Sequence, residues 1–267
     1  MPSADMAIML LTSAAGAPGV TTLAVGLALT WPRAVILADC DPTAGQAVLA
    51  GYLRGQCHTS KGLIRVAEAH RDRRPLAEVV MDQTIELATD AAHRRLLLPG
   101  FSKPGSARLF ANVWADLTEA FAGFDAAGID VVVDAGRMGA DGLPFPLLER
   151  AGVVAMVTRT QLRAIAASRV HGATLIEQCR QTAADPTAGM ILVGEGQPYS
   201  GREISSLMGL PVLGTVADDP GHAVCLSDGS RRPRKFHSSP LVRSLRHLSS
   251  QLGAQLERSA DRVGAAS

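Results

Sequence analysis

Lysine is scarce in this 267-residue sequence and is absent from its first sixty positions. The lysines are Lys61, Lys103 and Lys235, so arginine supplies nearly all of the 26 basic side chains. Acidic side chains number 25, which leaves a formal net charge of +1. A chain so close to neutrality has no overall charge with which to attract nucleic acid or an anionic membrane surface.

Cysteine pairs and long apolar runs are also missing. Cys40, Cys57, Cys179 and Cys225 are scattered, without the C-x-x-C spacing of metal and redox sites. We therefore expect four reduced thiols, as in a cytoplasmic protein. No apolar run approaches the ~20 residues that span a bilayer. Asp5, rather than a basic stretch, precedes the first apolar run, so a signal peptide is not expected.

Hydrophobic residues make up 47% of the chain and charged residues 19%, which favours a large folded core over disorder. Seven short apolar runs are predicted to be strands: 7–12, 34–38, 95–98, 129–134, 152–158, 190–194 and 211–216. Helical patterns lie between them, at 20–31, 43–53, 61–69, 105–122, 161–182 and 200–209. Because these runs are apolar throughout rather than alternating, they are typical of strands buried on both faces. The sequence predicts an α/β fold, a doubly wound and mostly parallel sheet flanked by helices.

The C-terminal part has a different character. Residues 227–240 are polar, basic and rich in turn formers, so we expect an exposed loop there. A stripe of leucines at helical spacing follows: Leu241, Leu245, Leu248, Leu252 and Leu256. It predicts an amphipathic helix over 241–259, packed on the α/β domain of residues 1–226 and followed by a tail at 260–267. A helix that lies on a membrane surface or a partner protein is the alternative.

Residues 13–22, SAAGAPGVTT, have the outline of a phosphate-binding loop. Such a loop delivers backbone N–H groups and the positive end of the next helix to an anion. Against the pattern G-x-x-x-x-G-K-[ST], Gly19 and Thr21 match, whereas Ala14 and Val20 replace the first glycine and the lysine. The candidate nucleotide-binding residues of this loop are Gly16, Ala17, Gly19, Val20, Thr21 and Thr22.

Carboxylates stand where two predicted strands end. Asp39 and Asp41 follow strand 34–38, and Asp134 ends strand 129–134. Ligands of open α/β sheets bind at the carboxyl edge of the strands. These side chains therefore favour a functional site over ordinary surface polarity.

In order along the chain, these motifs resemble the MinD/ParA family of P-loop ATPases, including its CpaE/TadZ branch. That family's loop reads K-G-G-x-G-K-T-T, so Thr21 and Thr22 match the final pair, while its two lysines fall on Ala15 and Val20. VILADCDPTAGQ resembles the family's D-x-D motif, and IDVVVDAGR its Walker B strand. GLPVLGTVADDP resembles the late strand that leads to the adenine.

The resemblance implies a P-loop NTPase fold that binds ATP or ADP with Mg²⁺. Thr21, Asp39 and Asp134 would hold the metal, and the two aspartates would also serve catalysis. Asp218 and Pro220 would border the adenine. It further implies a homodimer that recruits a protein partner.

Loss of the Walker lysine weakens this site. A missing charged hydrogen bond and the absent N–H of Pro18 together cost about 2–4 kcal/mol, or roughly 30- to 1000-fold in affinity. An arginine near the carboxyl edge is a candidate replacement. Arg137 is our first choice because it follows Gly136, which the resemblance places in the switch segment after the Walker B strand, and Arg159 is the second. The alternative, which we favour from the sequence, is that each arginine forms an ordinary surface ion pair.

We therefore expect a positioning or assembly protein that binds adenine nucleotide weakly or conditionally and acts through dimerisation and partner recruitment. Pilus or secretion-system placement, cell division and chromosome positioning are the processes that the resemblance implies. One alternative is a nucleotide-independent pseudo-ATPase scaffold, and another is an active ATPase with an arginine in place of the lysine. A metabolic P-loop or Rossmann enzyme has the least support, because no G-x-G-x-x-G occurs.

The expected location is the cytoplasm, with recruitment to a membrane or cell pole by a partner. Residues 230–235, SRRPRK, form a basic cluster of the kind that binds DNA non-specifically. With a net charge of only +1, such a cluster is more often a solvated loop. Binding to DNA or to a membrane surface is therefore not favoured.

Overall fold

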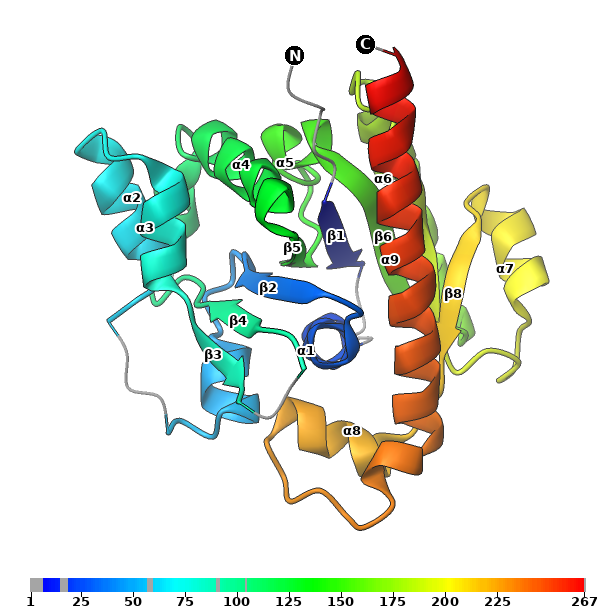
Figure 1. Ribbon diagram of the computed structural model, residues 1–267. Coiled ribbons are helices and arrows are strands. Elements are labelled where there is room, and N and C mark those ends of the chain that lie inside the picture. The colour runs from blue at the N-terminus through cyan, green and yellow to red at the C-terminus, as the bar shows by residue number, and fades with distance from the viewer. Residues whose placement is uncertain (1–6, 15–18, 57–59, 90–91, 104, 267) are drawn as a thin grey trace.

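The computed structural model describes residues 7–14, 19–56, 60–89, 92–103 and 105–266. Within them, eight strands form one sheet in the order β3-β4-β2-β5-β1-β6-β7-β8 (Figure 1). The strands are β1 (Ile8–Ser13), β2 (Ala34–Asp39), β3 (Ile85–Ala88), β4 (Arg95–Leu98), β5 (Ile129–Arg137), β6 (Ala151–Arg159), β7 (Thr187–Val193) and β8 (Val212–Val216). Neighbouring strands are parallel except β3 and β4, which confirms the predicted mostly parallel sheet.

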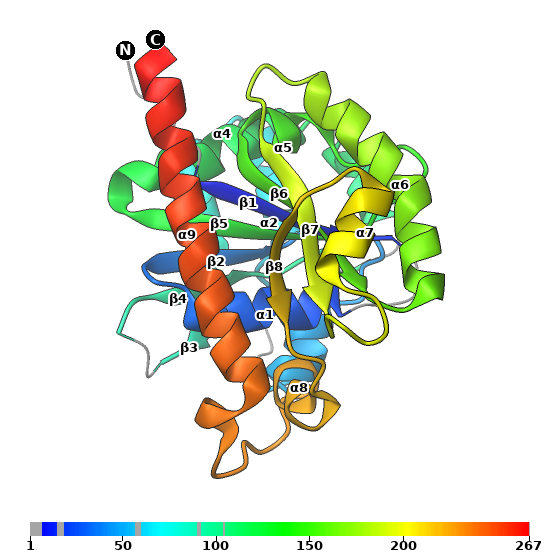
Figure 2. The ribbon, with the colours of Figure 1, turned by 90° about the vertical axis from the view of Figure 1, so that its right-hand side faces the viewer.

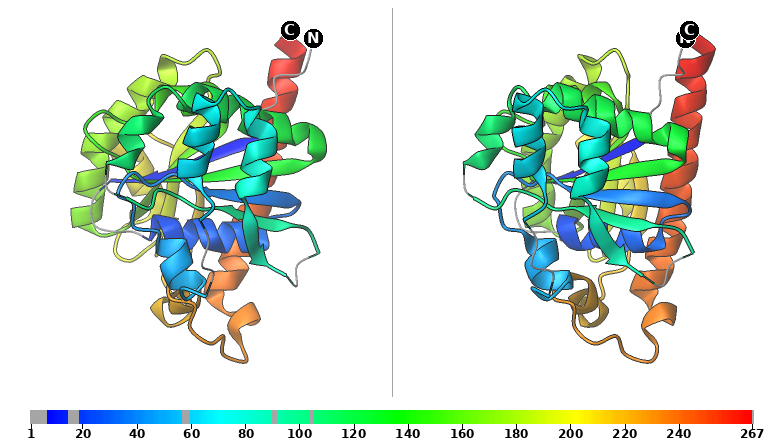
Figure 3. Two further views of the ribbon diagram at one scale, coloured as in Figure 1. Left: turned by 90° about the vertical axis from the view of Figure 1, so that its left-hand side faces the viewer. Right: turned by 60° about the vertical axis from the view of Figure 1, so that its left-hand side comes forward.

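Helices cover both faces of the sheet. One face carries α1 (Val20–Thr30), α8 (Pro220–Ser227) and α9 (Pro240–Ala266) (Figure 2). The other carries α2 (Leu63–Arg71), α3 (Leu76–Gln83), α4 (Trp114–Gly123), α5 (Phe145–Glu149) and α6 (Leu162–Arg180), the first three of which stand in front of the sheet in Figure 3. Helix α7 (Gly201–Met208) packs with α6 beside β7 and β8.

Alternate residues of the central strands enter different cores. In β1, Ile8 and Leu10 belong to the core under α2–α6, whereas Met9 and Leu11 belong to the core under α1, α8 and α9. All four side chains are fully buried. Because both faces of such a strand are covered, its sequence is apolar throughout. This continuous apolar run is the pattern from which the strand was predicted.

Several elements differ from the prediction. The helix expected at 43–53 is reduced to one π-helical turn, η1 (Val48–Tyr52), because Ala44 and Gln46 adopt positive φ angles that a helix does not allow. The helix expected at 105–122 divides into a 3₁₀ turn, η2 (Ser106–Phe110), and α4. Of the α-helices and strands in the described residues, α3, β3, α5 and α8 were not expected.

The last helix is longer than predicted. Helix α9 begins at Pro240 and runs to Ala266, so most of the expected tail at 260–267 is helical. The five leucines of its stripe are buried against α1, β6 and β8. Gly26 of α1 lies in close contact with this stripe, since a Cβ there would lie 2.7 Å from Cδ1 of Leu245. The stripe is thus part of the core, which argues against the alternative of a free membrane-binding face.

The segment at 227–240, expected to be an exposed loop, is partly anchored. Phe236 is buried in a short 3₁₀ turn, η4 (Phe236–Ser238), and Ser239 is buried beside it, whereas Arg231, Arg232 and Arg234 are exposed. Cys40, Cys179 and Cys225 are free, buried thiols, and Cys57 lies outside the described residues. In the described part of the chain, no helix has the length and hydropathy of a membrane span.

Candidate functional site

The phosphate-loop motif joins β1 to α1 at the carboxyl edge of the sheet. Gly16 and Ala17 lie outside the described residues, as do Ala15 and Pro18. Gly19 precedes the first residue of α1 with φ 88° and ψ 38°, a left-handed conformation that glycine adopts without strain. Its carbonyl accepts the N–H of Leu23 at 2.8 Å, the first helical bond of α1. Gly19 therefore turns the chain directly into the amino end of a helix, where backbone N–H groups attract anions.

Two aspartates lie side by side at this edge. Asp39 ends β2, Asp134 lies near the end of β5, and the two residues are register partners in adjacent parallel strands. Asp39 is 6% exposed and Asp134 is fully buried. The Gly136 N–H donates to Oδ1 of Asp134 at 2.9 Å, but Oδ2 of Asp134 has no partner among the described residues.

Burial disfavours the ionised form of both carboxyls. It raises the pKa of Asp39 to about 7, with a further contribution from the negative charge of Asp134. It raises the pKa of Asp134 to about 6, against the opposing effects of the Thr21 side chain and the Gly136 N–H. A buried carboxyl pair with raised pKa values, one oxygen of which lacks a partner, is typical of functional sites.

These side chains suit the coordination of a magnesium ion rather than that of a metal held entirely by protein ligands. No group of three His, Cys, Asp or Glu side chains with metal-binding geometry occurs among the residues that the structure describes. Mg²⁺ differs from other biological metals in that it keeps several waters and takes only one or two carboxylates, together with phosphate oxygens. The unpartnered Oδ2 of Asp134, the Asp39 carboxylate and the adjacent Thr21 side chain supply such a set.

Asp41 contacts the last residues of β5. Gly136 has φ +63°, and a Cβ at this position would lie 2.4 Å from Cγ of Asp41, so only glycine fits. Oδ1 of Asp41 also accepts bonds from the N–H and the hydroxyl of Thr43, each at 2.8 Å. The chain after β2 and the end of β5 are therefore in close contact next to the aspartate pair.

Gly100, which follows β4, is close to the backbone and carboxyl of Asp39. A Cβ at Gly100 would lie 2.6 Å from the Asp39 carbonyl oxygen and 2.7 Å from its Cγ. We expect Gly100→Ala to lower the free energy of unfolding by about 1–3 kcal/mol, the usual cost of overpacking, in urea denaturation. Gly123→Ala is the matched control, because its Cβ would meet no atom within 4 Å. Equal free energies of unfolding for the two variants would show that Asp39 shifts to accommodate the added methyl group.

A cavity of about 110 Å³ lies beside Gly19 and Thr22. Arg159 and Asp218 line it and form an ion pair, with 2.6 Å between Arg159 Nη1 and Asp218 Oδ2. Apolar side chains, Leu226 and Leu245 among them, form the rest of its wall. The structure thus places Arg159 at the candidate nucleotide site.

Arg137, our first choice from the sequence as a substitute cation, ends β5 and is the register partner of Ser13, the last residue of β1. It lines a separate cavity of about 600 Å³, together with Trp114 and Phe145. The buried members of that lining belong to the core under α2–α6, on the opposite face from α1. Val20, at the position of the Walker lysine, is 9% exposed and packs into the core on the face of α1.

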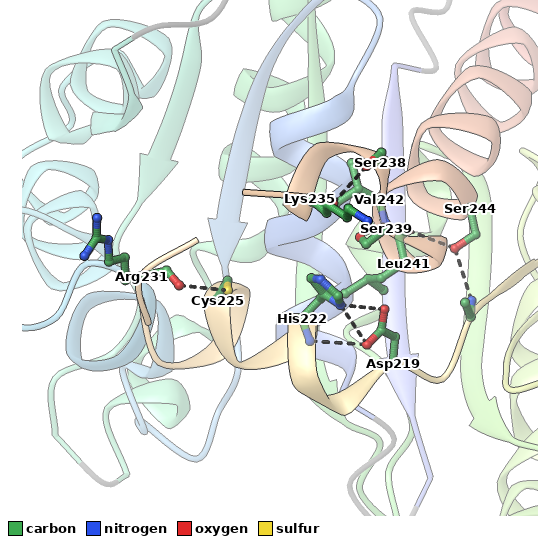
Figure 4. A network of polar contacts seen from close by, with 11 residues as sticks. Asp219, His222, Cys225, Arg231, Lys235, Ser238, Ser239, Leu241, Val242 and Ser244 are labelled. Carbon is green, nitrogen blue, oxygen red and sulfur yellow. Dashed lines mark hydrogen bonds and ion pairs between the residues drawn. The ribbon is translucent and has the colours of Figure 1, made fainter. Parts of the chain in front are cut away.

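The adenine-loop candidates sit at the start of α8. Asp219 caps this helix by accepting the N–H of His222 at 3.3 Å, and its Oδ2 lies 2.8 Å from Nδ1 of His222 (Figure 4). Pro220 is the first residue of α8 and is exposed, whereas Asp218 and Asp219 both line the cavity. Oγ of Ser244 in α9 accepts the N–H of Ala217 at 3.1 Å, which ties this loop to the last helix.

Some of this site was not predicted. The Arg159–Asp218 pair joins residues 59 positions apart, and no local sequence pattern predicts that these two side chains meet. The contact of Gly100 with Asp39 is equally hidden, because it depends on the order of β2 and β4 in the sheet. The cap at Asp219 had a readable signal, an aspartate directly before a proline at a helix start.

Comparison with protein-family models gives no match, and neither does comparison with curated protein sequences. Solved structures do match. The chain superposes on the MinC:MinD cell division protein complex of Aquifex aeolicus with a TM-score of 0.68 and 15% identity, over 92% of this chain and 96% of the other. It superposes on a ParA family ATPase from Chlorobium tepidum TLS with a TM-score of 0.64 and 17% identity, over 91% of this chain and 98% of the other. For the septum site-determining protein MinD of Pyrococcus horikoshii OT3 in complex with Mg-ADP, the TM-score is 0.62 and the identity 18%, over 92% of this chain and 95% of the other. Identities this low establish the fold alone: the chain has the P-loop NTPase fold of the MinD and ParA ATPases.

Proposed function

We propose that the protein is a MinD/ParA-like positioning or assembly protein that binds ATP or ADP with Mg²⁺ weakly and acts through dimerisation and partner recruitment. The observation that carries the proposal is the buried pair Asp39 and Asp134, with one unpartnered oxygen, beside the start of α1. Two carboxyls buried side by side, with one oxygen unpartnered, are costly to keep ionised, and a cation bound there would offset that cost.

Two of the similar structures support this assignment through what they contain. One is a complex of MinD with MinC, and another holds Mg-ADP. Bound Mg²⁺ would neutralise phosphate charge in this chain, while Thr21, Asp39 and Asp134 would orient it. Without a lysine at Val20, we propose binding that is weak and hydrolysis that is slow.

Arg159 is the proposed substitute for the missing lysine. Its guanidinium is 2.6 Å from Asp218 in the cavity next to Gly19, and a phosphate can compete with that carboxylate for the same donors. We expect Arg159→Gln to weaken Mg-ATP binding about tenfold or more in calorimetric titration. Arg137→Gln, which removes an exposed arginine of the other cavity, is the control and should bind like the wild type. A loss of affinity in Arg137→Gln alone would reinstate Arg137 as the substitute.

A nucleotide-independent scaffold is the second candidate function. The Val20 side chain is packed in the core, and Arg159 already has a partner in Asp218, so neither residue needs phosphate to complete its contacts. The titration above separates the two candidates when combined with sedimentation velocity. Absence of Mg-ATP binding, together with a dimer that forms equally with and without nucleotide, would establish the scaffold. A dimer that forms only with Mg-ATP would establish the nucleotide-dependent protein.

A further inference from the structure

A second cavity, of about 360 Å³, lies on the face of α1 at the far end of that helix from Gly19. It is bounded by the last turns of α1, the start of β4, η4 and the first turns of α9 (the region of α1 and α9 is seen in Figure 2). Four basic side chains line it: Arg95, Arg232, His237 and Arg246. No acidic side chain is among the described residues of its lining.

Arg95 is the buried member of this basic group. It is 5% exposed, and its two Nη atoms donate to the backbone carbonyls of Trp31 and Arg33. These contacts stabilise the end of α1, yet Nε has no partner, and Arg95 forms no ion pair with any described residue. Burial lowers the pKa of Arg95. A buried guanidinium without a counter-charge is costly, and an anion in the cavity would relieve that cost.

The other three basic side chains are exposed at the mouth of the cavity. Arg232 donates through Nη2 to the Tyr52 hydroxyl at 3.1 Å, and its guanidinium lies 5.3 Å from the centre of the Phe236 ring. Arg246 donates through Nη1 to the His237 carbonyl at 3.0 Å. Each arginine is therefore oriented by one neutral contact and keeps further N–H donors, and neither forms an ion pair with a described residue.

The remaining wall is apolar. It consists of Gly26, Leu29, Ala88, Leu226, Phe236, Val242 and Leu245, with Thr30 as an additional polar residue. A volume of about 360 Å³ is within the range of small-molecule sites, roughly 300–1,000 Å³. The cavity thus offers basic groups from its buried end to its mouth and an apolar surface between them.

We propose that this cavity binds a phosphate monoester carried on a compact apolar or aromatic body. Three guanidinium groups call for an anion with more than one charge and several acceptor oxygens, which a phosphate monoester provides and a single carboxylate does not. The apolar wall accounts for the body of the ligand. The site is distinct from the proposed nucleotide site, because none of its four basic residues lines the cavity beside Gly19.

The test is calorimetric titration of the full chain with phenyl phosphate and, separately, with inorganic phosphate. We expect phenyl phosphate to bind more tightly, since its ring contacts the apolar wall. Arg232→Ala/Arg246→Ala should weaken binding at least about tenfold, because it removes two charged donors from the mouth. Arg234→Ala/Arg243→Ala is the matched control: it removes two exposed arginines of the same region that do not line the cavity, and its affinity should be that of the wild type.

Arg95→Met should abolish binding, with circular dichroism as a check of folding. The exposed double variant keeps the test decisive if Arg95→Met fails to fold. A third arm uses phosphatidylcholine vesicles with and without phosphatidic acid, a lipid phosphate monoester. Co-sedimentation that requires phosphatidic acid and the two rim arginines would identify a lipid headgroup as the source, whereas binding of phenyl phosphate alone would identify a free molecule. If no probe binds, or if Arg232→Ala/Arg246→Ala binds as the wild type does, the proposal is overturned.

Discussion

Val20→Lys is expected to tighten Mg-ATP binding by roughly 10- to 150-fold, the value of one charged hydrogen bond to phosphate. Val20 is the first residue of α1, directly after Gly19, and so occupies the position from which a Walker lysine reaches the phosphates. Gly19 turns the chain into the helix at this point, so a lysine at position 20 would begin at the amino end of α1. The variant restores one of the two charges that the loop lacks relative to the family pattern. Calorimetric titration with Mg-ATP measures the change.

Val20→Met is the control for this experiment. Methionine has a long unbranched side chain but no charge, so it disturbs the packing of Val20 in the core to a similar degree. We expect its affinity to remain that of the wild type. If Val20→Lys is folded and also binds no better than the wild type, the loop does not present a phosphate cradle. In that case the scaffold is the better description of the protein.

Asp39→Asn is expected to stabilise the nucleotide-free protein and to flatten its dependence on pH. The pKa of Asp39 is raised to about 7 in the folded state from 3.8 in the unfolded state. Between these values the folded protein holds a proton that the unfolded chain has released, so stability falls as the pH rises from about 4 to about 7. Three units correspond to about 4 kcal/mol at pH 8, as an upper figure. Asparagine has no such charge to bury.

Urea denaturation at pH 5 and pH 8, in the absence of Mg²⁺ and nucleotide, measures this effect. The wild type should lose stability between the two values, and Asp39→Asn should lose much less of it. Asp82→Asn, at an exposed position, is the control and should follow the wild type. Parallel pH profiles for wild type and Asp39→Asn would mean that Asp39 is solvated rather than buried in solution. The magnesium site proposed here would then lose its main electrostatic support.

The central part of the sheet could be predicted because its strands are covered on both sides. Strand 95–98 was predicted with its observed bounds, and β2 and β6 within one residue at each end. The edge strand β3, with sequence IELA, was missed because half of its residues are only partly buried, so its apolar pattern is weak. Helices α3 and α5 are short segments that begin after a proline, and they are specified by packing more than by periodicity.

The acidic half of the candidate site was also predictable. Asp39 and Asp134 each lie where a buried strand approaches the carboxyl edge, and adjacent parallel strands bring such positions together. The basic half was not. The cavity that each of Arg137 and Arg159 lines depends on the local backbone: Gly136, with its positive φ, directly precedes Arg137, and the pairing of β1 with β5 shifts register between Leu11 and Ser13. Sequence alone does not specify that local change.

Leu226 and Leu245 each line two cavities on the α1 face, the cavity beside Gly19 and the cavity lined by Arg95. The two cavities therefore share a wall that is one side chain thick. A ligand that alters the rotamer of either leucine on one side changes the volume on the other. Thermodynamic linkage requires this effect to be reciprocal. If a ligand in one cavity changes the affinity of the other cavity by some factor, a ligand in that other cavity changes the affinity of the first by the same factor.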